Sequence, residues 1–269
     1  MDFETIKVDI ENKIATVSLN RPEKANAMNA KLWQEFRQVF DKLSELPQVR
    51  VVVLRGEGRH FCAGIDFGFI SQMVGSLSGV PEGAKQEKLR KTILDLQDCL
   101  DSAARCSKPV IAAIHGRCLG GGLDMVAACD MRLATSGAVF SIKEIDLGIV
   151  ADVGSLQRLP HLVSEGVLRE WALTGREISA EKACREGLIN RVVAEEELLE
   201  EAMGLAGLIA SKSPLAVRGT KEVLNRTRDM SVQDGLDYVA TWNASMLLSK
   251  DAQLAGMAAM AKRQAVFDD

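Results

Sequence analysis

Two short, continuously apolar runs, each followed by a glycine-rich loop, constrain the fold of this chain most. They are VRVVVLRG at residues 49–56 and KPVIAAIHG at residues 108–116. Such runs are typical of strands that are buried on both faces of a parallel sheet. Helical patterns follow both loops, so the strand, turn and helix recur at least twice. This recurrence predicts an α/β fold.

The segments around these strands predict further elements. Residues 6–19 alternate apolar and polar around a turn at 11–13, which indicates a β-hairpin. Apolar residues recur at helical spacing from Leu32 to Leu43. Residues 73–88 are the least periodic part of the chain and are interpreted as a mobile excursion, with a helix over residues 89–104.

From about Leu198 the pattern becomes wholly helical. We therefore expect a core over residues 1–197 and a helical region over residues 198–269. The helical region has too many apolar residues for a free helical hairpin, so it is expected to pack on its own core or on another subunit.

Composition excludes several classes of protein. The net charge of −4 gives no footprint for nucleic acid. Only three histidines and no C-x-x-C pair argue against zinc, and the six cysteines, mostly in apolar runs, indicate reduced, buried thiols. No run is long enough to span a bilayer, and neither a signal peptide nor a peroxisomal C-terminal tripeptide is recognisable. A cytoplasmic location is expected. Ser155 and Ser213 lack a G-x-S-x-G frame, which argues against an α/β-hydrolase.

The two glycine-rich loops match neither nucleotide-binding fingerprint. GEGRHF lacks the third glycine of G-x-G-x-x-G, and GRCLGGGLD lacks the Lys-Ser or Lys-Thr of a P-loop. Two such loops side by side could offer two converging backbone N–H groups, which is the design of an oxyanion hole. Tight turns and close packing are the other explanation, and spacing alone favours them.

Three carboxylates lie in one apolar tract: Asp124, Glu144 and Asp152. Each has a structural explanation when it is taken singly. Asp124 could complement a helix dipole, Asp152 could cap the next helix, and Glu144 could pair with Lys143 or Arg158. Taken together, clustered carboxylates with raised pKa values are what proton transfer at carbon requires.

Several motifs resemble the enoyl-CoA hydratase/isomerase (crotonase) family. They are FCAGID at residues 61–66, residues 115–135 and residues 140–160, and the resemblance extends over nearly the whole chain. It implies a spiral of repeated β-β-α units followed by a helical C-terminal trimerisation region. Within the family, GGGLD, residues 143–160 and residues 228–247 are most similar to the dienoyl-CoA isomerases.

The resemblance also implies roles for single residues. The N–H groups of Ile65 and Gly121 match the oxyanion hole that binds the thioester carbonyl. Glu144 matches an acid shared with hydratases, Asp124 stands where a hydratase has Glu, and Asp152 stands where a hydratase has Gly. A further set of positions is implied to contact the CoA part of the substrate: Ala25, Ala27, Ala63 and Asp66.

The implied reaction converts 3,5-dienoyl-CoA to 2,4-dienoyl-CoA in fatty-acid β-oxidation. Glu144 is expected to take the C2 proton and Asp152 to supply a proton at C6, with Asp124 as a supporting acid. Coenzyme A is part of the substrate, so neither a metal nor another cofactor is expected. The expected partners are this acyl-CoA thioester and further copies of the chain, as a homotrimer or a dimer of trimers, without nucleic acid or membrane.

Two alternatives stay open on the sequence. The first is another reaction of the same family, either hydration of 2-enoyl-CoA or a shift of 3-enoyl-CoA to 2-enoyl-CoA; the shorter side chain at Asp124 counts against hydration. The second is a binding or assembly protein that contacts RNA. The negative net charge and the three retained acids argue against the second alternative.

Overall fold

A computed structural model describes residues 2–268, and it begins with the predicted hairpin. Strands β1 (Ile6–Glu11) and β2 (Ile14–Leu19) pair antiparallel. The turn residues Asn12 and Lys13 have φ values of 50° and 68°. Two consecutive residues with positive φ give a two-residue turn whose twist matches that of the strands. The hairpin prediction is confirmed.

The hairpin forms one edge of a six-stranded sheet with the order β1-β2-β3-β4-β6-β9. From β2 onward all neighbouring strands are parallel. The additional strands are β3 (Val51–Gly56), β4 (Val110–Ile114), β6 (Met131–Thr135) and β9 (Arg191–Val193). A smaller sheet contains β5 (Arg117–Leu119), β7 (Val139–Ser141) and β8 (Ile178–Ser179).

Strand β3 is buried on both faces, as its continuous apolar run predicts. Val52 and Leu54 point into the larger hydrophobic core, which they share with helices α1 (Ala30–Glu45) and α3 (Glu82–Arg105). Val51 and Val53 point to the opposite face, where helix α8 (Leu198–Ala210) packs on the sheet. The alternation follows the two-residue period of a strand.

Short α-helices and 3-10 turns connect the strands. The α-helices among them are α2 (Phe67–Gly75), α4 (Gly121–Ala127), α5 (Ser155–Arg158), α6 (Glu165–Thr174) and α7 (Ala180–Arg185). The 3-10 turns are η1 (Pro22–Lys24), η2 (Glu144–Leu147), η3 (Leu159–His161) and η4 (Glu195–Glu197).

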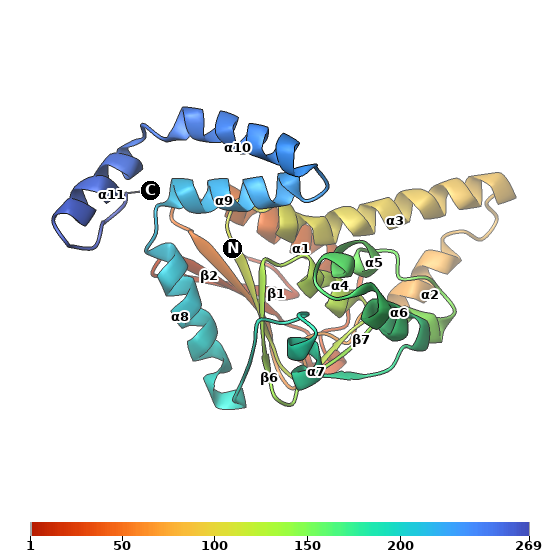
Figure 1. Cartoon of the computed structure of the whole chain (residues 1–269). Helices are drawn as coiled ribbons and strands as arrows, with labels where there is room; N and C mark the ends of the chain where they lie inside the picture. The colour runs from red at the N-terminus through yellow and green to blue at the C-terminus, as the bar shows by residue number, and fades with distance from the viewer. Residues whose placement is uncertain (1, 269) are drawn as a thin grey trace.

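The segment interpreted as an excursion, residues 73–88, is largely helical, which corrects that interpretation. Helix α2 extends to Gly75, and α3 already begins at Glu82. The first part of α3 projects away from the body of the molecule (Figure 1), so its side chains are mostly exposed and show no apolar period. Side-chain hydrogen bonds from Lys85 and Gln86 to Glu82, at 3.4 and 2.9 Å, support this turn instead.

Three helices complete the chain: α9 (Pro214–Thr227), α10 (Val232–Met246) and α11 (Lys250–Met260). Figure 1 shows α10 lying along α9, with α11 at the far end. The guanidinium of Arg50 donates to the carbonyl oxygens of Ala210 at 2.9 Å and Phe267 at 2.7 Å. Both ends of this helical excursion are therefore fixed at the same side chain. The division at residue 197 stays a prediction, and α8, just beyond it, packs on the sheet.

The cysteines are all free thiols, as expected. Five are buried, and Cys184 is half-buried. Burial raises the pKa of the Cys62 and Cys129 thiols to about 12, so both stay neutral. Across residues 2–268, none of the helices combines the length and apolar character that a membrane crossing needs.

Candidate active site

The two glycine-rich loops lie side by side, as an oxyanion hole requires. Cys62 and Cys118 form an isolated parallel β-bridge, and the N–H of Leu119 donates to the carbonyl of Cys62 at 3.0 Å. A Cβ atom on Gly64 would stand 2.9 Å from the carbonyl oxygen of Leu119. Gly64 also has a φ of 92°, so both conformation and close approach require glycine there.

The N–H groups of Ile65 and Gly121 are free at this junction. The neighbours of Ile65 pair with Met28, because Met28 N–H donates to the carbonyl of Gly64 and Asp66 N–H donates to that of Met28. Within residues 2–268, the N–H groups of Ile65 and Gly121 have no protein acceptor. Both residues line one cavity of about 140 Å³. The structure thus brings the two predicted donors together beside a space for a substrate oxygen.

Two of the three predicted acids, Glu144 and Asp152, line the same cavity. The third, Asp124, lies on α4 and is fully buried. Most other side chains around the cavity are apolar: Trp33, Phe67, Leu96, Leu147, Ile149 and Val153. The acids therefore lie in surroundings that disfavour their charged forms.

Asp124 is held by one oxygen and left free at the other. Its Oδ1 accepts hydrogen bonds from the N–H and the hydroxyl of Ser155, each at 2.5 Å. No N–H or hydroxyl within residues 2–268 donates to Oδ2, and a side-chain hydrogen bond couples the Asp124 carboxyl to that of Glu144. Burial, and next the charge of Glu144, raise the pKa of Asp124 to about 8. At neutral pH this carboxyl is largely protonated.

Among residues 2–268, no cationic side chain forms an ion pair with Glu144. Its Oε2 is buried without a donor, and a Cβ on Gly120 would stand 3.1 Å from Oε1. Burial is the main cause that raises the pKa of Glu144, and the nearby charge of Asp152 adds to it. The hydrogen bond with Asp124 acts in the opposite direction and favours the ionised Glu144. The pair thus favours a neutral Asp124 beside an anionic Glu144.

The ion pairs considered for Glu144 from the sequence are wrong. Lys143 pairs with Asp146 at 2.6 Å, and Arg158 pairs with Asp101. Glu144 and Asp146 belong to the same 3-10 turn, η2, but Glu144 is buried and Asp146 is exposed. Lys143 also lines the cavity, but its ammonium pairs with the exposed carboxylate of Asp146 and not with Glu144.

Asp152 is not the helix cap that its sequence context allows. The N-cap of α5 is Gly154, and no side chain caps that helix. The main-chain carbonyl of Asp152 accepts a hydrogen bond from the Gln97 amide at 2.6 Å, which fixes this loop to α3. The side chain is half-buried at the cavity, and burial raises its pKa.

The residues expected to contact CoA form a rim beside the cavity. Ala63 lines the cavity, and its N–H donates to the carbonyl of Ala25 at 2.9 Å. Arg21 donates to the carbonyl of Ala27 and forms an ion pair with Asp66 at 3.0 Å. Burial acts to raise the pKa of Asp66, but the hydrogen bond from Arg21 and those from the start of α2 lower it overall. Asp66 is thus an ionised, already engaged carboxylate, and contact with CoA stays a prediction for all four residues.

Three residues at the site were not singled out from the sequence. The sequence points to Ser155 only as a possible nucleophile and to Gly120 only as part of a turn. Asn26 is fully buried and joins the rim to the first glycine loop, because its amide donates to the carbonyls of Glu57 and His60 at 2.9 and 2.8 Å. A lone Asn or Ser carries no local pattern that would reveal such contacts.

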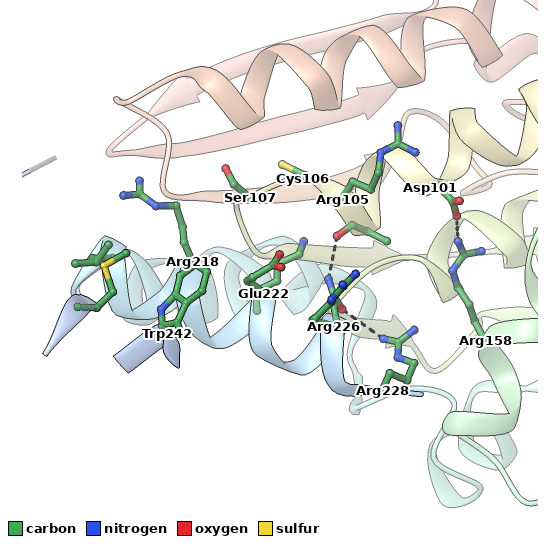
Figure 2. Close-up of a pocket in the computed structure, with 15 residues that line it drawn as sticks. Asp101, Arg105, Cys106, Ser107, Arg158, Arg218, Glu222, Arg226, Arg228 and Trp242 are labelled. Carbon is green, nitrogen blue, oxygen red and sulfur yellow. Dashed lines mark hydrogen bonds and ion pairs between the residues drawn. The ribbon is translucent and has the colours of Figure 1, made fainter. Parts of the chain in front are cut away.

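A larger cavity of about 740 Å³ lies elsewhere, between the end of α3 and helices α9 and α10 (Figure 2). It contains none of the predicted site residues. Several of its charges are already paired: Arg158 with Asp101, Arg105 with Asp98, and Lys221 with Asp130. Among residues 2–268, no cluster of His, Cys, Asp and Glu could hold a metal ion. The small cavity, with its free N–H groups and unpaired acids, is the candidate active site.

Comparison with known proteins agrees with this geometry. The family model described as enoyl-CoA hydratase/isomerase matches residues 9–269. The chain belongs to the enoyl-CoA hydratase/isomerase family, and it is thus similar to enzymes of the crotonase fold. This confirms the family and the fold that the sequence motifs implied.

Within the family, individual relatives show which enzymes this chain is similar to. The chain is 44% identical to the peroxisomal Delta(3,5)-Delta(2,4)-dienoyl-CoA isomerase of Arabidopsis thaliana, over 98% of this chain and 96% of the relative. It is 43% identical to the mitochondrial enzyme of that name from Mus musculus, over 97% of this chain and 81% of the relative. The crystal structure of an enoyl-CoA hydratase from Bacillus anthracis has 32% identity and a TM-score of 0.88, covering 98% and 99% of the two chains.

These relatives also correct the expected cytoplasmic location, which is wrong. The Arabidopsis enzyme is named peroxisomal and the mouse enzyme mitochondrial. The expectation rested on the absence of a recognisable address. A missing targeting signal does not identify a compartment, because the signals that direct a chain to an organelle are separate from the residues that form the fold and the site.

Proposed function

We propose that this chain is an isomerase that converts 3,5-dienoyl-CoA to 2,4-dienoyl-CoA, a reaction of fatty-acid β-oxidation. The observation that carries the proposal is one apolar cavity that joins two free N–H groups to two acids, Glu144 and Asp152. Relatives more than 40% identical over almost the whole chain bear the name of this activity. The substrate is accordingly an acyl-CoA thioester.

The reaction moves one proton and two double bonds. The C2–H bond breaks and its electrons form the C2–C3 double bond. The C3–C4 double bond moves to C4–C5, and the electrons of the C5–C6 double bond bind a proton at C6. The C2 proton becomes acidic because the N–H groups of Ile65 and Gly121 stabilise the negative charge that develops on the thioester oxygen. Such a donor typically contributes about 3 kcal/mol.

We assign the base to Glu144 and the acid to Asp152. The hydrogen bond with Asp124 favours the anionic Glu144, which is the form that accepts a proton. Burial raises the pKa of Asp152, which favours the neutral form that donates one. After each turnover the proton gained by Glu144 and the proton lost by Asp152 are re-equilibrated, so the enzyme is unchanged. Proton transfer between carboxyls and carbon needs no redox group or metal, and CoA belongs to the substrate.

The apolar side chains of the C-terminal helices support self-association. Val232, Leu247 and Leu248 are more than two-thirds exposed in the single chain. Leaving a set of large apolar side chains in water is unfavourable, and a second copy would cover them. The homotrimer or dimer of trimers that the family implies is therefore part of this proposal.

An ultraviolet assay with 3,5-dienoyl-CoA tests the function. We expect the absorbance of the thioester-conjugated 2,4-diene to appear on mixing, because isomerisation brings the diene into conjugation with the carbonyl. Crotonyl-CoA serves as the comparison substrate, and we expect slow hydration, because Asp124 is bound by Ser155 and Glu144. Rapid hydration of crotonyl-CoA without isomerisation of the diene would replace the proposal by enoyl-CoA hydratase activity.

A further inference from the structure

The loop that leads into α5 places a buried serine against the acids. Ser155 is the first residue of α5 and is 1% exposed. Its N–H and its hydroxyl both reach the same atom, Oδ1 of Asp124, at 2.5 Å. Ser155 does not line the cavity. A side chain with these contacts can act only through Asp124.

The two hydrogen bonds determine which way Asp124 faces. With Oδ1 occupied by two donors, the carboxyl is held in one orientation, Oδ2 is left without an N–H or hydroxyl donor, and the carboxyl is coupled by a hydrogen bond to that of Glu144. A carboxyl without this tether could rotate about its Cα–Cβ and Cβ–Cγ bonds and leave Glu144 without a hydrogen-bonding partner. Glu144, whose Oε2 already lacks a donor, would then be a buried carboxylate without its hydrogen bond to Asp124.

We propose that Ser155 is a positioning residue, which holds Asp124 by Oδ1 so that Oδ2 stays directed at the catalytic base Glu144. This inference deepens the proposed function, on which its kinetic part rests. It assigns to a residue outside the cavity the task of keeping the base anionic and oriented. No bond to Ser155 forms or breaks during the reaction.

The surroundings of α5 are built to keep Ser155 in place. Gly154 has a φ of 137°, and a Cβ there would overlap the guanidinium of Arg158. That guanidinium forms an ion pair with Asp101 on α3, drawn as a dashed line in Figure 2. The short helix is thus fixed to a long one by a largely buried arginine, and Ser155 is fixed at its start.

The titratable groups near Asp124 come from two elements and one loop. Glu144 belongs to η2 and Cys118 to β5, and Asp152, in the loop before α5, acts on Glu144 through its charge. Burial raises the pKa of Cys118 far above its usual range, so that thiol stays neutral. The hydroxyl of Ser155 lowers the pKa of Asp124 against burial and the charge of Glu144. Removal of the hydroxyl should therefore raise the pKa of Asp124 further.

The test compares Ser155→Ala with Ser155→Thr, which retains the hydroxyl, and with the control Ser102→Ala. Ser102 is equally buried, and its hydroxyl donates only within its own helix, to the carbonyl of Cys99 at 2.6 Å. We expect Ser155→Ala to lower kcat about tenfold with KM within about twofold, Ser155→Thr to restore most of kcat, and Ser102→Ala to leave both unchanged. Equal losses of kcat in the Ala and Thr variants would overturn the proposal.

A second readout does not depend on turnover. The folded-state pKa of Asp124 is raised, so the stability that its protonation contributes is lost as the pH rises toward about 8. In Ser155→Ala the pKa is higher still, so the loss continues to higher pH. Urea unfolding should therefore show a larger destabilisation near about pH 9 than near about pH 6 for Ser155→Ala, and a constant one for Ser102→Ala.

The background of Asp124→Asn isolates the interaction, because Ser155→Ala should there cost the same stability at both pH values. A pH-independent cost in the presence of Asp124 would overturn the positioning role, whatever the substrate is. If Ser155→Ala does not fold, Ser155→Cys fills the same space with a weaker donor and should show the same pH trend. A wild-type enzyme that is inactive on 3,5-dienoyl-CoA would overturn only the proposed function.

Discussion

Two buried regions of this chain treat a carboxylate in opposite ways. Glu35 on α1 is 3% exposed, and its oxygens accept from the N–H groups of residues 4 and 5 and from the Thr5 hydroxyl at 2.6–2.9 Å. Lys31 adds an ion pair at 3.5 Å. Burial acts to raise the pKa of Glu35, but these contacts lower it overall. Glu35 is thus an ionised side chain whose hydrogen bonds hold residues 4 and 5 against α1.

The acids at the cavity are buried as well, but they have few donors. Asp124 and Glu144 each have one oxygen without an N–H or hydroxyl donor, and the pKa of both is raised. The difference lies in the supply of donors, because burial is common to all three side chains. A buried carboxylate with a full set of donors stabilises the fold, whereas one with an unfilled oxygen can gain or lose a proton.

Replacement of Asp152, the acid that we assign to C6, should have the largest effect. Asp152→Asn removes the transferable proton but preserves the shape, so we expect kcat for 3,5-dienoyl-CoA to fall about a thousandfold or more. Asp146→Asn is the matched control, since Asp146 lies nearby in η2, is exposed and pairs with Lys143. A stopped-flow absorbance assay measures both variants. Full activity in Asp152→Asn would remove this residue from the mechanism.

Replacement of the structural acid should affect stability and leave turnover intact. Glu35→Gln loses charge-assisted hydrogen bonds, so we expect the free energy of unfolding in urea to fall by about 2 kcal/mol near neutral pH. Because the folded-state pKa is lowered from 4.5, this contribution is present above pH 4.5 and is lost as the pH falls through the lowered value. Glu45→Gln, exposed at the end of the same helix, is the control. A loss of kcat as large as that in Asp152→Asn would end the distinction between the two regions.

A smaller loss of activity and stability should follow when a side chain is placed against Glu144. Gly120→Ala places a Cβ 3.1 Å from Oε1 of Glu144, at a φ of 49° that L-residues rarely adopt. We expect a loss of about 1 kcal/mol in stability and a fall of a few-fold in kcat, as Glu144 shifts to relieve the contact. Gly137→Ala, where a Cβ meets nothing within 4 Å, should change neither quantity. Thermal melts and initial rates measure both; equal behaviour of the two variants would show that Glu144 tolerates displacement.

The periodicity of apolar residues is sufficient to predict most of the regular helices and strands. The hairpin, α1 and the buried strands have clear periods, because each buries a full face or both faces. The first turns of α3 bury almost nothing, so the rule that found the other helices had no signal there. Exposed helices supported by charged pairs are the kind of element that such patterns miss.

The residues of the site could be predicted from sequence motifs, but the hydrogen bonds and ion pairs that set their charges could not. The motifs identified Ile65, Gly121 and the three acids, and the structure brings these residues to one place. Ser155 is 31 residues from Asp124 in sequence, and a contact of that separation leaves no local mark. The choice between Glu144 and Asp146 as partner of Lys143 depends on which side chain turns inward, and sequence alone does not specify it.

The two hydrogen bonds of Arg50 bring the two ends of the C-terminal helical segment to the same side chain. The chain leaves the core at Ala210 and returns at Phe267 to the same guanidinium, so the ends of the intervening segment are already close together. The loop-closure entropy of such a segment is little affected by its length or content. Helix α9 is also held to the core by the ion pair of Lys221 with Asp130 at 2.8 Å, so α10 and α11 are the helices that can be lengthened, shortened or exchanged while the sheet and the acid cluster keep their geometry.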